Sequence, residues 1–248
     1  MIIFAISNEK GGQAKTTTAA ALSEGTAKRG YRVLAIDGDP QGALSYELND
    51  GEPLPGTSGL YEVITGKEKV QSAVMQTRTE GVYLLRATNE LAGLDRELEG
   101  NVNALKEALR KVARIYDYVF IDCPAMVNIM QLNAIMCADK LIIPATADAY
   151  AVRSIQHTID VMESAQKVGS KITLAGILFT KVRKRGLLDN SVYDAARHGT
   201  YKGKVFKTQI HERAQVRQMA VLHNSIMDGN TETAREYYSL LDELKIKR

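Results

Sequence analysis

The sequence predicts an α/β fold of three layers, in which a mostly parallel central sheet lies between two layers of helices. Short apolar segments alternate along the chain with longer stretches whose apolar residues recur at helical spacing. The short segments are apolar throughout rather than at every second residue, which is typical of parallel strands buried on both faces. These predicted strands cover residues 2–6, 31–36, 82–86, 117–121, 140–144 and 172–179.

Length and composition predict a single soluble domain over residues 1–248. The chain has 45% hydrophobic and 25% charged residues, as ordinary globular domains do. No apolar run approaches the roughly 18 residues that a membrane span needs, and the first predicted strand follows Met1 directly. We therefore expect a cytoplasmic protein without a signal peptide or a membrane helix.

The start of the chain predicts a phosphate-binding loop. The first predicted strand runs into Ser-Asn-Glu-Lys-Gly-Gly-Gln-Ala-Lys-Thr-Thr at residues 7–17, and a predicted helix over residues 16–29 follows. Backbone N–H groups of such a loop and the positive end of the helix dipole attract anions. Lys15 can reach the β- and γ-phosphates and the Thr16 hydroxyl can bind Mg²⁺, so the segment predicts an ATP site. The alternative is a glycine turn whose lysines are merely solvated.

Two further predicted strands end in carboxylates. The second is followed by Asp37-Gly38-Asp39-Pro40-Gln41-Gly42, and the fourth by Asp122. Two acids at a strand end can share a hydrated Mg²⁺ and an attacking water, although a turn built on Asp, Gly and Pro would have the same composition. Ligands of parallel sheets bind at the carboxyl ends of the strands, so Lys15, Asp39 and Asp122 are expected to lie at one site.

The loop departs from the ordinary phosphate-loop pattern, G-x-x-x-x-G-K-[ST], because Glu9 and Ala14 stand at the two glycine positions. It resembles instead the deviant Walker A loop of the ParA/MinD class of ATPases, K-G-G-x-x-K-[ST], with Lys10 as the signature lysine. Residues 37–42 match the second acidic motif of this class, D-x-D-P-Q-G, and residues 118–125 resemble its Walker B segment. The resemblance covers nearly the whole chain.

This resemblance implies a single ParA-like domain, a deviant Walker A P-loop NTPase that hydrolyses ATP with Mg²⁺. Lys15 would hold the phosphates, and Lys10 would reach across an ATP-sandwich homodimer to the partner's nucleotide. Asp39 would direct the attacking water, Thr16 and Asp122 would support the metal, and Asp37 would lie in the outer shell of the metal. The residues implied to contact ATP are Gly11, Gly12, Gln13, Ala14, Lys15, Thr16 and Thr17.

Ala14 is the clearest departure from the loop of this class, which commonly has glycine before the Walker lysine. A left-handed backbone at this position would cost alanine about 1–2 kcal/mol and would weaken ATP binding or slow turnover. The alternative is that the loop accommodates alanine in an allowed conformation, with Gln13 adding a contact of its own.

Positive charge gathers between residues 181 and 217, although the net charge is only +3. Such a cluster alone can be solvated surface. The resemblance to Soj-related ParA proteins implies that the ATP-bound dimer binds non-specific double-stranded DNA through this segment. No aromatic residue stands within residues 181–185 or 213–217, which favours phosphate contacts on duplex over base stacking. The residues implied to bind DNA are Lys184, Arg185, Arg213 and Arg217.

The resemblance further implies a ParB-like centromere-binding partner that stimulates hydrolysis, a nucleoid-associated location and a role in segregating a plasmid, mobile element or chromosome. One alternative is the same ATPase positioning another cargo. Another is a weakly hydrolysing, ATP-switched DNA-binding protein, since Gln13 and Ala14 are unusual in the loop.

The remaining features predict structure rather than chemistry. A C-terminal helix is expected from Thr231, and its acidic residues argue against membrane binding. Cys123 and Cys137 lack the local pattern of cluster ligands, so they are expected to be buried free thiols rather than ligands of a shared iron–sulfur cluster.

Overall fold

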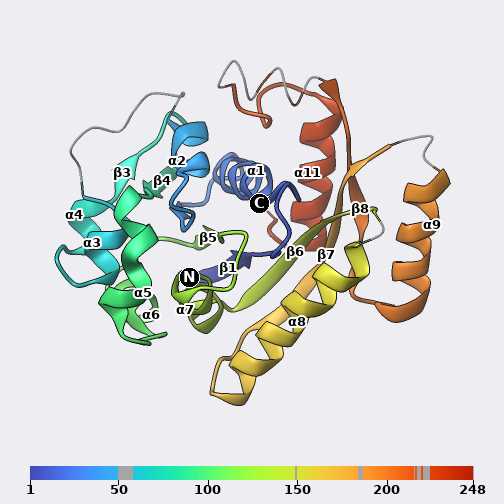
Figure 1. Ribbon diagram of the computed structural model, residues 1–248. Coiled ribbons are helices and arrows are strands. Elements are labelled where there is room, and N and C mark those ends of the chain that lie inside the picture. The colour runs from blue at the N-terminus through green and yellow to red at the C-terminus, as the bar shows by residue number, and fades with distance from the viewer. Residues whose placement is uncertain are drawn as a thin grey trace.

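A computed structural model describes residues 1–49, 58–148, 150–183, 187–214, 216, 219 and 224–247. Its centre is an eight-stranded sheet in the order β3-β4-β2-β5-β1-β6-β7-β8 (Figure 1). Every neighbouring pair is parallel except β3 and β4. The predicted fold class, a mostly parallel sheet between helices, is confirmed.

All six predicted strands are present, and two more were missed. The strands are β1 (Ile2–Ile6), β2 (Val33–Asp37), β3 (Met75–Gln76), β4 (Val82–Leu85), β5 (Tyr118–Asp122), β6 (Lys140–Thr146), β7 (Thr173–Val182) and β8 (Val205–His211). β3 has two residues, too few to give a pattern. β8 lies at the edge of the sheet, and only Phe206 and Ile210 in it are buried. A search for continuous apolar runs therefore passes over it.

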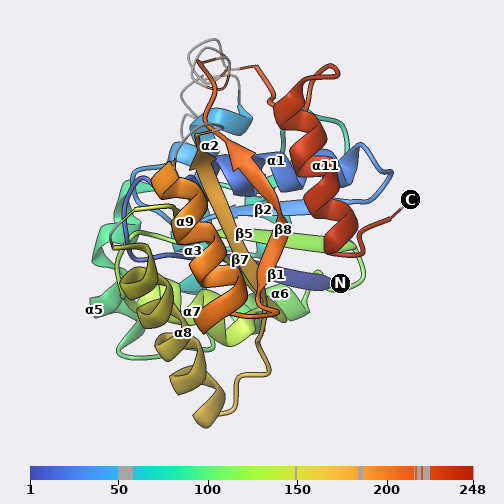
Figure 2. The ribbon, with the colours of Figure 1, turned by 90° about the vertical axis from the view of Figure 1, so that its right-hand side faces the viewer.

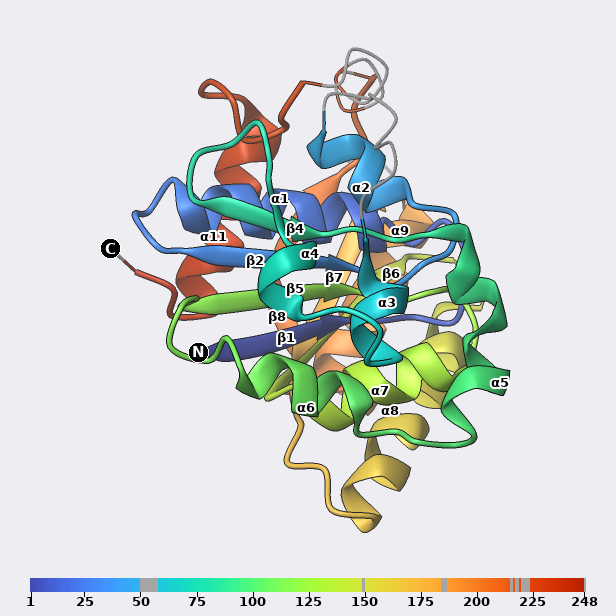
Figure 3. The same cartoon turned by 90° about the vertical axis from the view of Figure 1, so that its left-hand side faces the viewer.

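Helices cover both faces of the sheet. On one face lie α1 (Lys15–Ala27), α2 (Ala43–Leu48) and α11 (Glu232–Glu243), as Figure 2 shows from the side of α11. The other face carries α3 (Leu60–Ile64), α4 (Val70–Ala73), η1 (Asn89–Gly93), α5 (Leu94–Leu98), α6 (Ala104–Arg110), α7 (Ile129–Cys137), α8 (Ala151–Lys167), α9 (Leu187–Ala195) and the π-helical turn η2 (Ala196–Thr200). Figure 3 shows α1 and α6 on opposite sides of the strands.

The central strand β1 is held from both faces because its side chains alternate between the two helical layers. Ile3 and Ala5 join the core beneath α3 to α8, whereas Phe4 and Ile6 join the core beneath α1 and α11. Phe4 stacks on Phe120 of β5 with ring centroids 5.3 Å apart. This burial fixes the strand that carries the glycine loop.

The predicted C-terminal helix is present as α11, capped by the Thr231 side chain, which accepts a hydrogen bond from the Ala234 N–H at 3.0 Å. Its acidic residues have a structural role. Both carboxylate oxygens of Glu243 accept N–H groups of β8, and Glu236 accepts the N–H of His211. These bonds satisfy the free edge of the sheet. No helix in the described parts of the chain could cross a bilayer.

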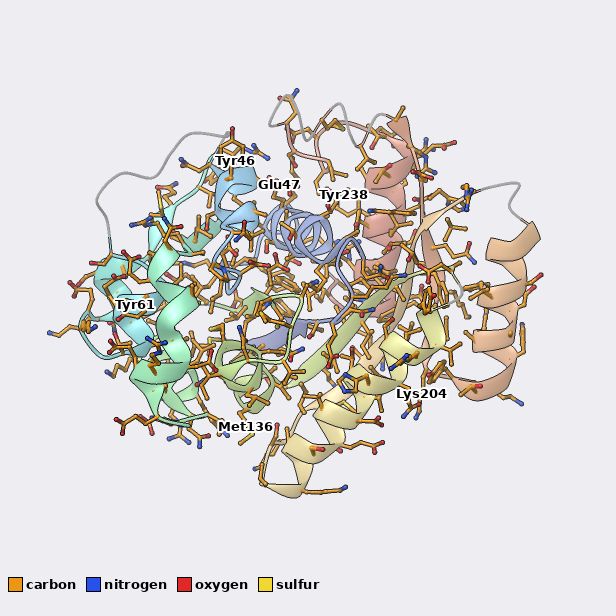
Figure 4. The ribbon with its side chains drawn as sticks, in the orientation of Figure 1. Tyr46, Glu47, Tyr61, Met136, Lys204 and Tyr238 are labelled. Carbon is orange, nitrogen blue, oxygen red and sulfur yellow. The ribbon has the colours of Figure 1, made fainter. Side chains whose placement is uncertain are left out.

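The face of α2 toward α1 is largely buried, with Leu44 and Leu48 fully enclosed and Glu47 half-buried. Figure 4 shows Glu47 on this side of α2, while Tyr46 lies at its outer end and is 49% exposed. Burial, together with the charge of Glu24 on α1, raises the pKa of Glu47 to about 7. The helix that follows the second acidic motif is therefore packed firmly against the helix that follows the glycine loop.

Candidate functional site

The carboxyl ends of β1, β2 and β5 bring the predicted residues together. In the register of the sheet Asp122 pairs with both Ile6 and Asp37. The glycine loop leaves β1 and enters α1 at Lys15, whose side chain is buried. The Thr16 hydroxyl donates a hydrogen bond of 2.7 Å to Asp122 Oδ2. Two motifs more than 100 residues apart thus meet at one point.

The residues predicted to contact ATP follow one another at the turn from β1 into α1. Gly11 and Gly12 are exposed at the tip, and Gly12 has φ 77°, a left-handed value that suits glycine. Gln13 is buried beneath them, and Thr16 and Thr17 are half-buried in the first turn of α1. Helix N-terminal N–H groups and exposed glycine backbone offer donors to an anion here.

Burial disfavours the charged forms of Lys15 and Asp122 when no ligand is bound. Burial lowers the pKa of Lys15, against the effect of Asp122, Cys123 and Asp39, which raise it. Burial and the nearby Asp37 raise the pKa of Asp122 well above its usual value, against the Thr16 hydrogen bond and Lys15. A bound anion would stabilise the charged form of Lys15, and a bound cation that of Asp122.

Mg²⁺ fits the donor atoms present. Asp122 Oδ1 is buried and has no hydrogen-bond partner among the described residues, while Oδ2 accepts from Thr16. A buried carboxylate oxygen without a partner is rare unless water or an ion fills its place. A carboxylate and a hydroxyl are also the hard oxygen ligands that Mg²⁺ takes beside phosphate and water.

Asp37 is engaged in holding the chain rather than free to meet a ligand. Its Oδ2 accepts the N–H and the hydroxyl of Ser45, both at 2.7 Å, and its Oδ1 accepts the Asp39 N–H at 3.2 Å. Burial raises its pKa to about 6. Its implied place in the outer shell of a metal stays a prediction, whereas its contacts fix the start of α2 and the turn that carries Asp39.

Asp39 is positioned differently from the two buried acids. Its side chain is half-buried and accepts the Gln41 N–H at 3.0 Å. The preceding Gly38 lies so close to β5 that a Cβ there would stand 2.8 Å from the carbonyl oxygen of Asp122. The Gly38 N–H donates to that same oxygen at 2.9 Å. Glycine therefore lets the acidic motif lie directly on the Walker B strand, with Asp39 at the open side.

Ala14 adopts the left-handed backbone that was expected to carry a cost, with φ 61° and ψ 33°. Gln13 also makes contacts of its own. Its Oε1 accepts the Thr146 N–H at 2.7 Å, and its carbonyl accepts the Thr180 hydroxyl at 3.1 Å. Ala14 is thus in the left-handed conformation expected to carry a cost, and of the alternative only the contacts of Gln13, which anchor the loop to β6 and β7, are observed.

We expect Ala14→Gly to raise ATP affinity or turnover by up to about tenfold, because glycine relieves about 1–2 kcal/mol of left-handed strain. ATP titration and phosphate release would measure the two quantities. Glu99→Gly is a matched control, since Glu99 is left-handed at φ 46° and belongs to none of the motifs. Unchanged affinity and rate in Ala14→Gly would show that the anchored loop tolerates alanine without functional cost.

The two charged side chains of the loop are tied to the segment after β6. Lys10 Nζ forms an ion pair with Asp148 and lies 5.7 Å from the ring centroid of Tyr150. Glu9 Oε2 contacts Nδ1 of His157 on α8. Sequence reasoning did not identify Asp148, Tyr150 or His157, because nothing in their local pattern points to the loop.

A cavity of about 250 Å³ adjoins the loop between α1, β7, β8 and α11. Its lining includes Ala14, Thr17, Thr180, Ile210 and Val216. Sequence reasoning missed it because β8, which forms one wall, was not predicted.

Of the residues predicted to bind DNA, only Arg213 lies within the described part of the chain. Its guanidinium donates to both oxygens of Glu236 at 2.6 and 2.7 Å and to Glu232 at 3.1 Å. The side chain is 14% exposed. Arg213 therefore fixes the first turns of α11 to the end of β8. The predicted contacts Lys184, Arg185 and Arg217 lie outside the described residues.

Cys123 and Cys137 are buried free thiols, as expected. Burial raises the pKa of Cys123 to about 12, with the Asp122 charge acting in the same direction. Neither thiol is poised for chemistry in this structure.

Comparisons with known proteins agree with the motifs. The profile of a family described as "AAA domain" matches residues 1–174. Chromosome partitioning protein ParA of Myxococcus xanthus is 31% identical over 251 residues, which cover 98% of this chain and 87% of that protein. Chromosome-partitioning ATPase Soj of Thermus thermophilus is 35% identical over 208 residues, covering 84% and 80%.

The fold is also that of a solved structure, the complex of a Cyanothece McdA variant with ATP. The TM-score is 0.91 at 24% identity, and the match covers 100% of this chain and 98% of the other. The nucleotide loop, the two acidic strand ends and the relatives matched over most of their length lead to one assignment: the chain belongs to the ParA/Soj family of chromosome-partitioning ATPases.

Proposed function

We propose that this protein is a Mg²⁺-dependent ATPase that dimerises around two ATP molecules, binds non-specific double-stranded DNA as that dimer, and releases the DNA after hydrolysis. The observation that carries the proposal is the pairing of Thr16 with Asp122 beside the buried Lys15, with one Asp122 oxygen left without a partner among the described residues. This is the donor set that a nucleotide and its metal would complete.

Each side chain has a distinct task in the proposed reaction. Lys15 neutralises the β- and γ-phosphates, and the loop backbone orients them. Thr16 and Asp122 would hold Mg²⁺, which neutralises charge that develops on the phosphates during transfer. Asp39, half-buried on the open side, orients the attacking water and accepts its proton. Asp37 holds the turn that places Asp39.

The cavity beside the loop is the proposed site for the adenine base. Ala14 and Thr17, beside the proposed phosphate site, line this cavity, and its volume of about 250 Å³ suits a planar base. Ile210 and Val216 supply apolar walls, and Thr180 lies among the polar groups of the lining. Such a mixture of apolar walls and few polar groups is usual for small-molecule sites.

Exposed hydrophobic residues beside the loop support a homodimer. Met126 and Val127 follow β5 and are 61% and 46% exposed, and Tyr150 and Val152 follow β6 and are 66% and 49% exposed. Since β5 and β6 flank β1, these side chains lie on both sides of the nucleotide loop. Large exposed apolar groups gathered in this way mark interaction surfaces.

The DNA and the partner are inferred from the family. The relatives are named as chromosome-partitioning proteins, and the segment 181–217 is strongly basic. We therefore propose duplex DNA and a ParB-like DNA-binding protein as the two macromolecular partners, with the ATP-bound dimer associated with the nucleoid in the cytoplasm and no contact with membrane.

Arg185→Glu and Arg217→Glu should each lose ATP-dependent binding to duplex DNA while still dimerising with ATP, because the charge reversal repels phosphate. Retention of a labelled random-sequence duplex, measured with ATP over a range of salt concentrations, would show this. Arg110→Glu on α6 carries the same charge change on an exposed residue of another element. Normal binding by both variants, or binding by the parent that salt does not weaken, would remove the DNA surface from this segment.

The conformation of the loop also supports the alternative of a DNA-binding protein that ATP binding alone switches. The left-handed Ala14 and the anchored Gln13 favour a weakly hydrolysing protein in which ATP binding alone switches DNA binding. In that case DNA binding would respond to ATP, but phosphate release would stay at background.

A further inference from the structure

The signature lysine of the loop is bound to an acid of its own subunit. Lys10 Nζ contacts Asp148 Oδ2, and both side chains are about one-third exposed, at 32% and 35%. Asp148 lies two residues after β6, the strand next to β1. The contact therefore joins the nucleotide loop to the neighbouring strand end.

The carboxylate of Asp148 is itself held in place. The Thr146 hydroxyl contacts its Oδ2 at 2.5 Å, and the Tyr150 N–H donates to its Oδ1 at 2.9 Å. Thr146 in turn donates its N–H to Gln13 of the loop. Partial burial alone would raise the pKa of Asp148, but the donors Lys10, Thr146 and Tyr150 together lower it. An ionised, preorganised carboxylate thus faces the lysine.

The contact with Asp148 holds Lys10 within its own subunit. A lysine that acts on the nucleotide of a partner subunit has to leave any acid that binds it within its own subunit. We propose that Asp148 is a positioning residue that holds Lys10 against its own subunit until the ATP-dependent dimer forms. This inference rests on the proposed function, because it takes Lys10 to act across the dimer.

Because the Lys10–Asp148 pair is partly exposed, it can change the dimerisation constant only modestly. Partly exposed ion pairs change an equilibrium by up to about fivefold. Each dimer requires two such pairs to open, one in each protomer, so the dimerisation constant changes by up to about 25-fold, the square of the single effect. Asp148 would thereby disfavour dimers at low ATP occupancy without preventing them.

The first test measures the ion pair without reference to dimers. In nucleotide-free Asp148→Asn, the amine of Lys10 should react several times faster with an acetylating reagent than in the parent, as followed by mass spectrometry of the peptide that contains it. Asn keeps an acceptor for the Tyr150 N–H but removes the charge. Asp160→Asn on α8 is the matched control, because Asp160 bonds Gln156 and not Lys10. An unchanged reaction rate of Lys10 would overturn the proposal.

The second test measures the effect of the Lys10–Asp148 pair on dimerisation. Sedimentation velocity with ATP and Mg²⁺ should give a tighter dimer for Asp148→Asn than for the parent, by up to about 25-fold, with unchanged affinity for ADP in the monomer. A weaker dimer would show that Asp148 belongs to the interface and overturn the proposal. If the parent formed no dimer with ATP, the proposed function would fail, while the reactivity of Lys10 would still decide whether Asp148 binds it.

Discussion

Asp39→Ala is expected to slow ATP hydrolysis by about 10²–10⁴-fold while ATP and Mg²⁺ still bind, the loss that removal of a general base commonly causes. Asp39 suits this test because its carboxylate makes a local bond to the Gln41 N–H and is only half-buried. Its removal should leave the fold intact. Asp37 would be a poor choice, since its fully buried carboxylate holds Ser45 and the start of α2.

Asp39→Ala is also expected to change how long the protein stays on DNA. Asp39→Ala should remain a dimer on duplex DNA for much longer than the parent, because release is proposed to follow hydrolysis. Phosphate release, ATP titration and dissociation from a labelled duplex would be measured side by side. Lys15→Ala is the contrasting variant, expected to fail at nucleotide binding. Hydrolysis by Asp39→Ala at the parent rate would exclude Asp39 as the group that directs the water.

Lys10→Ala is expected to abolish ATP-dependent dimerisation and hydrolysis together, with ATP binding preserved. Lys15 remains in place to hold the phosphates, whereas the charge of Lys10 is proposed to act only on the partner's nucleotide. In the structure of the single subunit, Lys10 contacts Asp148 and Tyr150 after β6.

Light scattering with and without ATP would measure the effect of Lys10→Ala, and ATP titration would verify that the nucleotide still binds. Lys140→Ala removes the exposed lysine that begins β6 and is bonded to Thr173, and this variant should dimerise as the parent does. Normal dimerisation of Lys10→Ala would contradict the assignment of position 10 as the signature lysine.

Much of the fold could be predicted because buried parallel strands leave a continuous apolar signal. Lys15, Asp39 and Asp122 each follow such a strand in the sequence, which predicted that they lie at one site. The structure brings them to one edge of the sheet. The strand β8 lacked this signal, since it lies at the edge of the sheet and only Phe206 and Ile210 in it are buried. Without β8, the cavity beside the loop could not be predicted.

The finer assignments depended on contacts between distant segments, which local patterns do not reveal. Arg213 reads as one more cation in a basic segment, yet it is bound to Glu236 across 23 positions of sequence. Asp148 reads as a turn residue, yet it binds Lys10 from 138 positions away. Asp37 and Asp39 stand in one motif, yet one is wholly enclosed and the other lies on the open side.

The most direct test of the proposed function is phosphate release by the parent protein with ATP and Mg²⁺, measured alone, with duplex DNA, and with DNA and the DNA-binding protein encoded beside it. Slow release that the combination of DNA and partner accelerates, and that Lys15→Ala abolishes, is the predicted result. Release at background under all three conditions, with DNA binding still dependent on ATP, would contradict an ATPase cycle and leave a protein switched by ATP binding alone.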